Sequence, residues 1–252
     1  MKLVRYAVDG TVAYGVLEED GIVRRLMGSP FESLKPGPTS HRVDEVRLLA
    51  PVDSPRIIGV GLNYVSHIRE CDLSTPTLPM LFMKHPSAVI GTEEAIVYPL
   101  DAQKVDFEGE FAVVIGQRTR RVPEEKALAC VLGYTCANDV SERVTQLAEM
   151  KMGCLLVGKS YDTFCPLGPV IATGLDPASL DLTTRLNGQV RQRINTSDLL
   201  FSVAKLVSYL SQAMTLWPGD VILTGTPSGV GPIQPGDVPA TWADAGRLIR
   251  LT

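Results

Sequence analysis

The sequence predicts a β-rich α+β protein with few helices. Short apolar runs bounded by Gly, Pro or polar residues outnumber the patterns that are typical of helices. Strands and helices do not alternate regularly, and neither a GxGxxG nor a Walker spacing occurs, so a Rossmann fold and a TIM barrel are not expected. A chain of 252 residues can form one large domain, or a small domain followed by a medium one.

The first fifty residues are expected to form a small β domain. Two Asp-Gly dipeptides, which favour the positive φ angles of tight hairpins, separate three strand-like runs. These predicted strands are Lys2–Val8, Val12–Glu18 and Gly21–Leu26. The polar stretch Lys35–Ser40 is expected to be a linker or a surface loop. We therefore place a boundary near Ala50, between a domain of residues 1–50 and a domain of residues 51–252.

The rest of the chain is predicted to be richer in strands than in helices. An Asn-Gly pair predicts a hairpin at Arg185–Val190. Helices are expected at Pro123–Val131 and at Ser197–Met214, the second with Ser197 as its N-cap. The predicted strands are Ile57–Val60, Leu81–Met83, Glu110–Gly116, Gly133–Ala137 and Val221–Thr224.

Composition excludes several classes of protein. The net charge of −4 argues against binding to a nucleic-acid backbone, which requires a basic face. No run approaches the roughly 18–20 apolar residues of a membrane span, and the charged segment Met1–Asp9 has no signal-peptide core. The five cysteines lack a CxxC pair, so we expect core thiols rather than a zinc site or a disulfide framework. A soluble cytoplasmic protein without nucleic-acid or membrane partners is expected.

The segment Val105–Gly116 combines acidic residues with an apolar strand. Because side chains alternate along a strand, Glu108 and Glu110 share one face and Gly109 lies on the other. Two carboxylates that lead into a core strand must face solvent, pair with a base or bind a cation. A solvated strand edge and a hard divalent cation, Mg²⁺, Mn²⁺ or Ca²⁺, both remain open from this segment alone.

A third oxygen ligand could come from Asp139, which follows the apolar run Gly133–Ala137. Taken by itself, Asp139 is better interpreted as a helix N-cap, since Asn and Asp are ordinary caps. Asp106 has the same strand parity as the two glutamates and competes with Asp139 for the ligand role.

The segment Gly61–Glu70 follows a short predicted strand. If it is helical, His67 and Glu70 are neighbours on one face. A carboxylate beside an imidazole raises the basicity of the ring and fixes its orientation, which suits a general base. The alternative is a surface ion pair, which would contribute little to stability.

Two other segments contain candidate binding groups. Lys159 lies between apolar residues and a turn-rich stretch, so its side chain either points inward toward an anionic ligand or is solvated. The loop Leu223–Gly231 follows a predicted strand, and its backbone N–H groups could receive a carboxylate. Small residues of this kind also form ordinary turns.

Taken in order, seven segments closely resemble the fumarylacetoacetate hydrolase superfamily. The resemblance implies an FAH-type mixed β-sheet roll with few helices, usually a homodimer, here preceded by the small N-terminal β domain. Two segments depart from the pattern, Ser141–Val144 and Cys154–Leu156, and both bear on the size and polarity of the substrate pocket. The matching segments are Gly61–Glu70, Leu81–Gly91, Asp106–Gly116, Gly133–Ser141, Gly158–Pro169, Leu186–Ser202 and Leu223–Gly231.

The resemblance also implies roles for individual residues. Metal-binding acids are matched by Glu108, Glu110 and Asp139, which overrides the interpretation of Asp139 as a cap. The implied ion is Mg²⁺ or Mn²⁺, with Ca²⁺ as a third candidate. A catalytic dyad on a short lid segment is matched by His67 and Glu70.

Four more residues fall in matching motifs. Lys159 matches an active-site lysine, and Thr226 matches the loop that receives the substrate carboxylate. Lys84 and Gln192 are assigned to substrate binding. The substrate implied by the family is a small 2-oxo acid.

The resemblance implies an enzyme that acts on 2-oxo or 2,4-dioxo acids through a metal-stabilised enolate. We expect hydrolysis of the C–C bond of an acylpyruvate, because a complete His67–Glu70 dyad suits the activation of water. Decarboxylation of the oxaloacetate type and isomerisation of a 2-oxo-heptenedioate share the enolate and remain close alternatives. A non-catalytic protein that binds a metal or a 2-oxo acid would be expected to lack the base or the lysine. A lysine ammonium in the gap between the three acids would contradict the metal-site hypothesis.

Overall fold

The structure is a computed structural model that describes residues 1–244 and 249–251. Its N-terminal part is an antiparallel meander in which β1 to β4 pair in sequence order and β5 pairs with β1. The three strands predicted in this region are present. The N-terminal strands are β1 (Lys2–Val8), β2 (Thr11–Leu17), β3 (Ile22–Leu26), β4 (Pro36–Arg42) and β5 (Arg47–Leu49).

Strand β4 corrects the prediction of a linker or loop at Lys35–Ser40. It pairs with β3 and forms one edge of the sheet. Pro36 and Pro38 have no backbone N–H to donate, and an edge strand tolerates this because its outer side has no partner strand. The prolines therefore indicated an edge strand rather than the absence of a strand.

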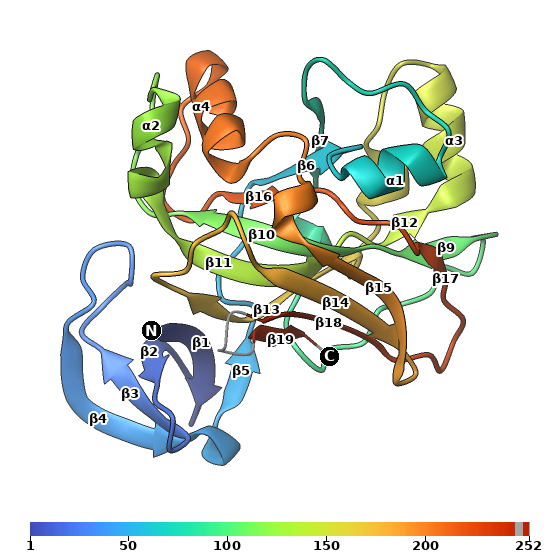
Figure 1. Cartoon of the computed structure of the whole chain (residues 1–252). Coiled ribbons are helices and arrows are strands. Elements are labelled where there is room, and N and C mark those ends of the chain that lie inside the picture. Colours follow the sequence, from blue (N-terminus) through green and yellow to red (C-terminus); the bar gives the residue numbers. More distant parts are fainter. Residues whose placement is uncertain (245–248, 252) are drawn as a thin grey trace.

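The largest sheet is mixed and continues from the N-terminal meander into the rest of the chain (Figure 1). The bounds of the strands after residue 50 are β6 (Ile57–Gly61), β7 (Met80–Lys84), β8 (Val89–Ile90), β9 (Val105–Phe107), β10 (Gly109–Ile115), β11 (Val131–Asn138), β12 (Ser141–Glu142), β13 (Cys165–Ala172), β14 (Asp181–Leu186), β15 (Gln189–Asn195), β16 (Val221–Leu223), β17 (Gly231–Pro232), β18 (Pro239–Asp244) and β19 (Ile249–Leu251). The strand order of this largest sheet is β4-β3-β2-β1-β13-β11-β10-β16-β6-β7. Strands β16 and β6 are parallel, whereas β1 joins β13 in antiparallel pairing.

Strand β10 is buried on both faces and divides the core into two clusters. Phe111, Val113 and Ile115 belong to one cluster, while Ala112 and Val114 belong to the other. This alternation is the two-residue period of a strand. Burial on both sides explains why the strand is almost continuously apolar after its acidic start.

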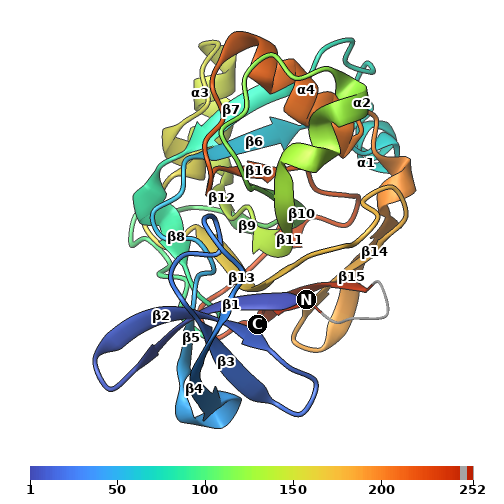
Figure 2. The same ribbon diagram turned by 90° about the vertical axis from the view of Figure 1, so that its left-hand side faces the viewer.

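Two smaller sheets complete the β structure, with the orders β12-β9-β17 and β15-β14-β18-β19. The predicted Asn-Gly hairpin is the turn between β14 and β15, where Asn187 and Gly188 both have positive φ angles. Figure 2 shows the N-terminal strands gathered at the end of the molecule opposite α2 and α4. The predicted β-rich α+β fold with few helices is confirmed.

The helices within the described residues are short. They are α1 (Val65–Glu70), α2 (Glu124–Ala127), α3 (Arg143–Lys151) and α4 (Val203–Ala213), with 3₁₀ turns at Val43–Glu45, Pro86–Ala88, Leu128–Cys130, Val157–Lys159 and Thr196–Asp198. The helix predicted at Pro123–Val131 is α2 followed by a 3₁₀ turn. Figure 1 shows α1 and α3 together, apart from the pair α2 and α4.

The prediction of one helix at Ser197–Met214 is wrong at its start. The N-cap of α4 is Ser202, whose side chain accepts a hydrogen bond from the N–H of Lys205. The N–H groups of Leu200 and Phe201 instead donate to the backbone and side-chain oxygens of Asn63. This distant partner interrupts the helix that the local pattern favoured.

The cysteine prediction is partly confirmed. Cys130, Cys136 and Cys165 are buried, but Cys71 and Cys154 are exposed, and the five cysteines form no disulfide with one another. Among the described residues, no helix combines the length and apolar character needed to cross a bilayer.

Candidate active site

Strand β10 and the residue that precedes it carry two of the predicted ligands. Glu110 lies within β10, and Glu108 lies between β9 and β10. The intervening Gly109 faces the sheet that contains β14 and β18. It lies so close to this sheet that a Cβ atom there would be 1.8 Å from Thr184 Oγ1. A residue without a side chain is therefore required between the two acids.

Pairing of β10 with β11 adds the third acid. Gly109 is opposite Asn138 in this register, and Asp139 follows directly. The N–H of Asp139 donates to the Glu108 carbonyl at 2.8 Å, and the N–H of Glu108 donates to Asn138 Oδ1 at 2.9 Å. One carboxylate oxygen from each of three buried acids then lies within 4.8 Å of the others, the acids being Glu108, Glu110 and Asp139.

The alternative roles of the acidic residues are resolved by their partners. The N-cap of α3 is Glu142, which accepts from the N–H of Thr145 at 2.6 Å, so Asp139 does not cap this helix. Asp106 pairs with Arg143 at 2.8 Å and is outside the group of three acids. The solvated-edge alternative is wrong for Glu108 and Glu110, since both are buried.

Two buried lysines contact this acidic group. Lys84 Nζ donates to Asp139 Oδ1 at 2.6 Å. Lys159 Nζ donates to Glu108 Oε2 at 2.7 Å and also to Asp139 Oδ2. The ammonium of Lys159 therefore bridges Glu108 and Asp139, so the arrangement that would contradict a metal site is present for this pair of acids. Glu110 differs, because it accepts from a neutral donor, the N–H of Gly225, at 2.8 Å.

The pKa shifts follow this unequal pairing. Burial opposes ionisation of Glu108, but the charges of Lys159 and Arg143 outweigh it and lower the pKa of its carboxyl group. Burial, and then the charges of Asp139 and Glu108, raise the pKa of Glu110 well above its usual range. Without a cation, Glu110 is thus the acid of the three that favours its protonated form, and a bound cation would replace that proton. Three converging carboxylates with this imbalance fit a hard divalent cation, whose preferred ligands are oxygens.

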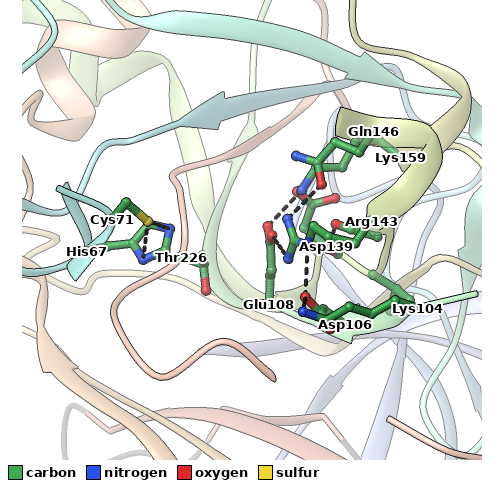
Figure 3. A network of polar contacts seen from close by, with 12 residues as sticks. His67, Cys71, Lys104, Asp106, Glu108, Asp139, Arg143, Gln146, Lys159 and Thr226 are labelled. Atoms are coloured by element: carbon green, nitrogen blue, oxygen red, sulfur yellow. Dashed lines mark hydrogen bonds and ion pairs between the residues drawn. The ribbon is translucent and has the colours of Figure 1, made fainter. Parts of the chain in front are cut away.

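Arg143 extends the network and was not singled out from the sequence. Its guanidinium, on the first turn of α3, donates to Asp106 at 2.8 Å, to Glu108 at 2.7 Å and to Gln146 Oε1 at 2.6 Å. Figure 3 shows these groups together with Lys159 on one side of the site. The Arg–x–x–Gln spacing on a helix was the available sequence signal, since such residues are neighbours.

His67 and Glu70 form the predicted pair on α1. His67 Nδ1 lies 3.0 Å from Glu70 Oε2, and Glu70 Oε1 accepts from the N–H of Gly229 at 3.1 Å. Cys71 Sγ lies within 3.9 Å of both ring nitrogens of His67. In Figure 3, His67 and Cys71 face the acidic network across the site, and Thr226 lies between this pair and Glu108.

Lys159 is placed by a helix that the sequence analysis did not connect to it. The carboxylate of Glu149, on α3, accepts N–H groups from Leu156 at 3.2 Å, Val157 at 2.7 Å and Gly158 at 3.0 Å. This cradle fixes the turn that carries Lys159. The side chain of Lys159 points inward, which was one of its two predicted alternatives.

Thr226 and Gln192 are joined to the acidic strand. Gln192 Nε2 donates to Thr226 Oγ1 at 2.8 Å, and Gln192 Oε1 accepts the N–H of Gly109 at 3.0 Å. Thr226 Oγ1 donates in turn to the Gly109 carbonyl at 3.0 Å. Thr226 lines the cavity described next, whereas Gln192 and Lys84 do not.

The three acids, His67, Lys159 and Thr226 line one cavity of about 180 Å³. Larger hollows lie elsewhere, one of about 440 Å³ beside Trp217, but the acidic group opens into this smaller one. The volume is below the roughly 300–1,000 Å³ of drug-sized ligand pockets, so a small substrate fits best. Its walls are formed by Val60, Gly61, Leu62, His67, Cys71, Leu73, Met80, Phe82, Glu108, Glu110, Asp139, Arg143, Gln146, Leu147, Met150, Leu155, Lys159 and Thr226.

Comparisons with known proteins identify the relatives of this chain. The family described as Fumarylacetoacetate (FAA) hydrolase C-terminal matches residues 56–252, and the family described as Rv2993c-like, N-terminal matches residues 1–51. A solved structure of 5-carboxymethyl-2-hydroxymuconate delta-isomerase from Mycobacterium smegmatis is 43% identical, with a TM-score of 0.91 over 100% of this chain and 97% of that one.

Two other relatives are named as an isomerase and a tautomerase. A solved structure of 2-hydroxyhepta-2,4-diene-1,7-dioate isomerase from Mycobacterium marinum is 38% identical, with a TM-score of 0.89 over 99% of this chain and 96% of that one. The mitochondrial oxaloacetate tautomerase FAHD2A of Bos taurus is 45% identical over 191 residues, which are 74% of this chain and 60% of the relative.

Proposed function

The chain belongs to the fumarylacetoacetate hydrolase family, and on that premise we propose that it is a divalent-cation-dependent enzyme that hydrolyses the C–C bond of an acylpyruvate. The observation that carries the proposal is the position of His67, which is paired with Glu70 and lines one small cavity together with three buried carboxylates and Lys159. Mg²⁺ or Mn²⁺, a homodimer and a cytoplasmic location are parts of the same proposal.

The acids Glu108, Glu110 and Asp139 would hold the cation. When bound, the cation supplies Lewis-acid polarisation of the substrate oxygens. Lys84 and Arg143 each neutralise part of the acidic group, and neither is assigned a contact with substrate. We therefore place Lys84, and likewise Gln192 behind Thr226, in positioning roles rather than in direct substrate binding.

His67 is proposed as the general base. When Nδ1 carries the proton and donates to Glu70, the lone pair of Nε2 is available to accept a proton from water. The water oxygen bonds to C4 of a 2,4-dioxo acid, the C3–C4 bond breaks, and its electron pair passes to the C2–C3 unit. His67 then returns the proton to C3, so that one carboxylic acid and one 2-oxo acid leave.

Lys159 and the loop at Thr226 complete the assignment. The ammonium of Lys159 lies against Glu108 and Asp139 and is proposed to stabilise the negative charge that develops on the 2-oxo group. Thr226 and the backbone after β16 would receive the substrate carboxylate.

A second candidate is proton transfer at C3 without bond cleavage. The names of the relatives, a tautomerase and two isomerases, favour it. The same base and lysine would act, but no water would be consumed. Decarboxylation of a 3-carboxylated 2-oxo acid would use the same charge stabilisation.

Product analysis separates these reactions. Purified protein with Mg²⁺ or Mn²⁺ is incubated with acetylpyruvate, fumarylpyruvate, oxaloacetate and a 2-oxo-heptenedioate, and the products are identified by mass. Hydrolysis yields pyruvate and one ¹⁸O atom in the released acid when the water is labelled. Turnover of acetylpyruvate without label in the acid would contradict hydrolysis, and enolisation detected by ultraviolet absorbance would support the second candidate.

A further inference from the structure

The two ends of the substrate cavity differ in polarity. The three acids at the buried end are at most 6% exposed. At the open end, Leu73 is 50% exposed, Leu147 is 52% exposed and Met150 is 42% exposed. A substrate that places its 2-oxo acid group against the buried acids must therefore direct its other end toward leucine and methionine side chains.

Cationic groups in the cavity wall are already paired. Among the described residues that line the cavity, the Lys and Arg side chains are Lys159 and Arg143. Lys159 is shared by two carboxylates, and Arg143 is held by Asp106 and Glu108 at 2.8 and 2.7 Å. A second carboxylate at the outer end of a substrate would gain no charged partner there, whereas an uncharged tail would cover the exposed apolar surface of Leu73, Leu147 and Met150.

We propose that this protein selects monocarboxylic 2-oxo acids that carry an apolar, uncharged acyl tail, and discriminates against dicarboxylic 2-oxo acids. The proposal rests on the proposed function and assigns its substrate class. The apolar side chains Leu73, Leu147 and Met150 cover the tail, and the buried acids and Lys159 take the 2-oxo acid end. The substrates named for the isomerase relatives end in a second carboxylate, so this chain differs from them in specificity.

Binding of unreactive ligands tests the assignment independently of turnover. Isothermal titration calorimetry with Mg²⁺ compares 2-oxohexanoate with 2-oxohexanedioate, which have the same number of carbons and differ at the far end. We expect 2-oxohexanoate to bind about tenfold more tightly or better, because only its uncharged tail covers the apolar surface at the open end without removing water from a carboxylate. Equal or tighter binding of the dicarboxylate would overturn the proposed specificity and leave the proposed function standing. If neither ligand binds, the proposed function itself is contradicted.

A charge introduced at the open end provides the matched variants. Met150 lies in the last turn of α3, where a cation is favourable, so Met150→Arg places a guanidinium at the outer end of the cavity. Met150→Leu is the uncharged control. We expect Met150→Arg to reduce the preference for 2-oxohexanoate by about tenfold or to reverse it, since a charge-assisted hydrogen bond becomes available, and Met150→Leu to retain it. An unchanged preference in Met150→Arg would show that the far end of the substrate does not reach this wall.

Discussion

Replacement of Gly109 by alanine tests whether the spacing of the acids depends on contact between two sheets. The new Cβ would lie 1.8 Å from Thr184 Oγ1 and 2.8 Å from Thr241 Oγ1. Both threonines are buried, face each other in the register of β14 and β18, and contact each other at 3.3 Å. Rotation of the Thr184 side chain would move its hydroxyl but would leave its Cβ only 3.0 Å from the new Cβ, so the two strands must move apart.

The expected cost is that of overpacking a closed core, about 1–3 kcal/mol. For a chain of this size, each kcal/mol lowers the melting temperature by roughly 2–4 °C, so a fall of about 2–12 °C is expected. Because Glu108 and Glu110 flank the site of the shift, kcat/KM for the cleaved acylpyruvate should also fall by about tenfold or more.

Gly37→Ala is the matched control for this variant. Gly37 lies in edge strand β4, where an added Cβ would meet Arg25 O at 3.4 Å and Met27 Cγ at 3.5 Å, which are ordinary contacts. A change within about 0.5 kcal/mol is expected for it. Differential scanning fluorimetry and the pyruvate-release assay measure both variants. If Gly109→Ala matches Gly37→Ala in stability and rate, the sheet contact does not set the position of the acids.

Three other outcomes follow from the site. His67→Ala should retain divalent-cation binding and lower kcat by about 10²–10⁴-fold, because it removes the base and no carboxylate; an unchanged rate would reduce the His67–Glu70 pair to a surface contact. Lys159→Met should lower the free energy of unfolding by about 3–5 kcal/mol, since two buried carboxylates lose a shared cation; a urea titration that detects no loss would refute this dependence. Without a divalent cation, the raised pKa of Glu110 stabilises the fold below the ordinary glutamate pKa, and this contribution disappears as the pH rises through the raised value. The melting temperature of the wild type should therefore decline relative to that of Glu110→Gln as the pH rises above the ordinary glutamate pKa, and parallel curves would contradict the shift.

Local patterns predicted those features that depend on neighbouring residues. The two-residue period predicted that Glu108 and Glu110 lie close together, and the three-residue spacing on a helix predicted the contact of His67 with Glu70. The turn at Asn187 depends on backbone preference, which the Asn-Gly pair reveals directly.

Features that depend on distant contacts were not accessible in this way. Lys84 meets Asp139 across 55 positions of sequence, and its spacing carries no period that would reveal the contact. The interruption before α4 arises from Asn63, which lies 138 positions from Phe201. Charge pairing across such separations is set by the sheet order, and composition does not encode it.

The family resemblance assigned more specific roles to the site residues than the local residue patterns did. Asp139, by itself, matched a helix cap as well as a ligand, and only its pairing beside Glu108 distinguishes the two. The resemblance did not indicate that Lys159 bridges two of the proposed ligands. This contact is a property of the packed core, where charges must be compensated.

Calorimetric titration of the metal-free protein with Mn²⁺, performed in two buffers of different ionisation enthalpy, tests the central claim most directly. The account predicts one ion per chain and release of about one proton, because the ion replaces the proton that Glu110 retains. It also predicts loss of binding in Glu110→Gln. Mn²⁺ binding of the same affinity in Glu110→Gln, or no binding to the wild type, would show that the three carboxylates are a structural ion-pair network rather than a metal site.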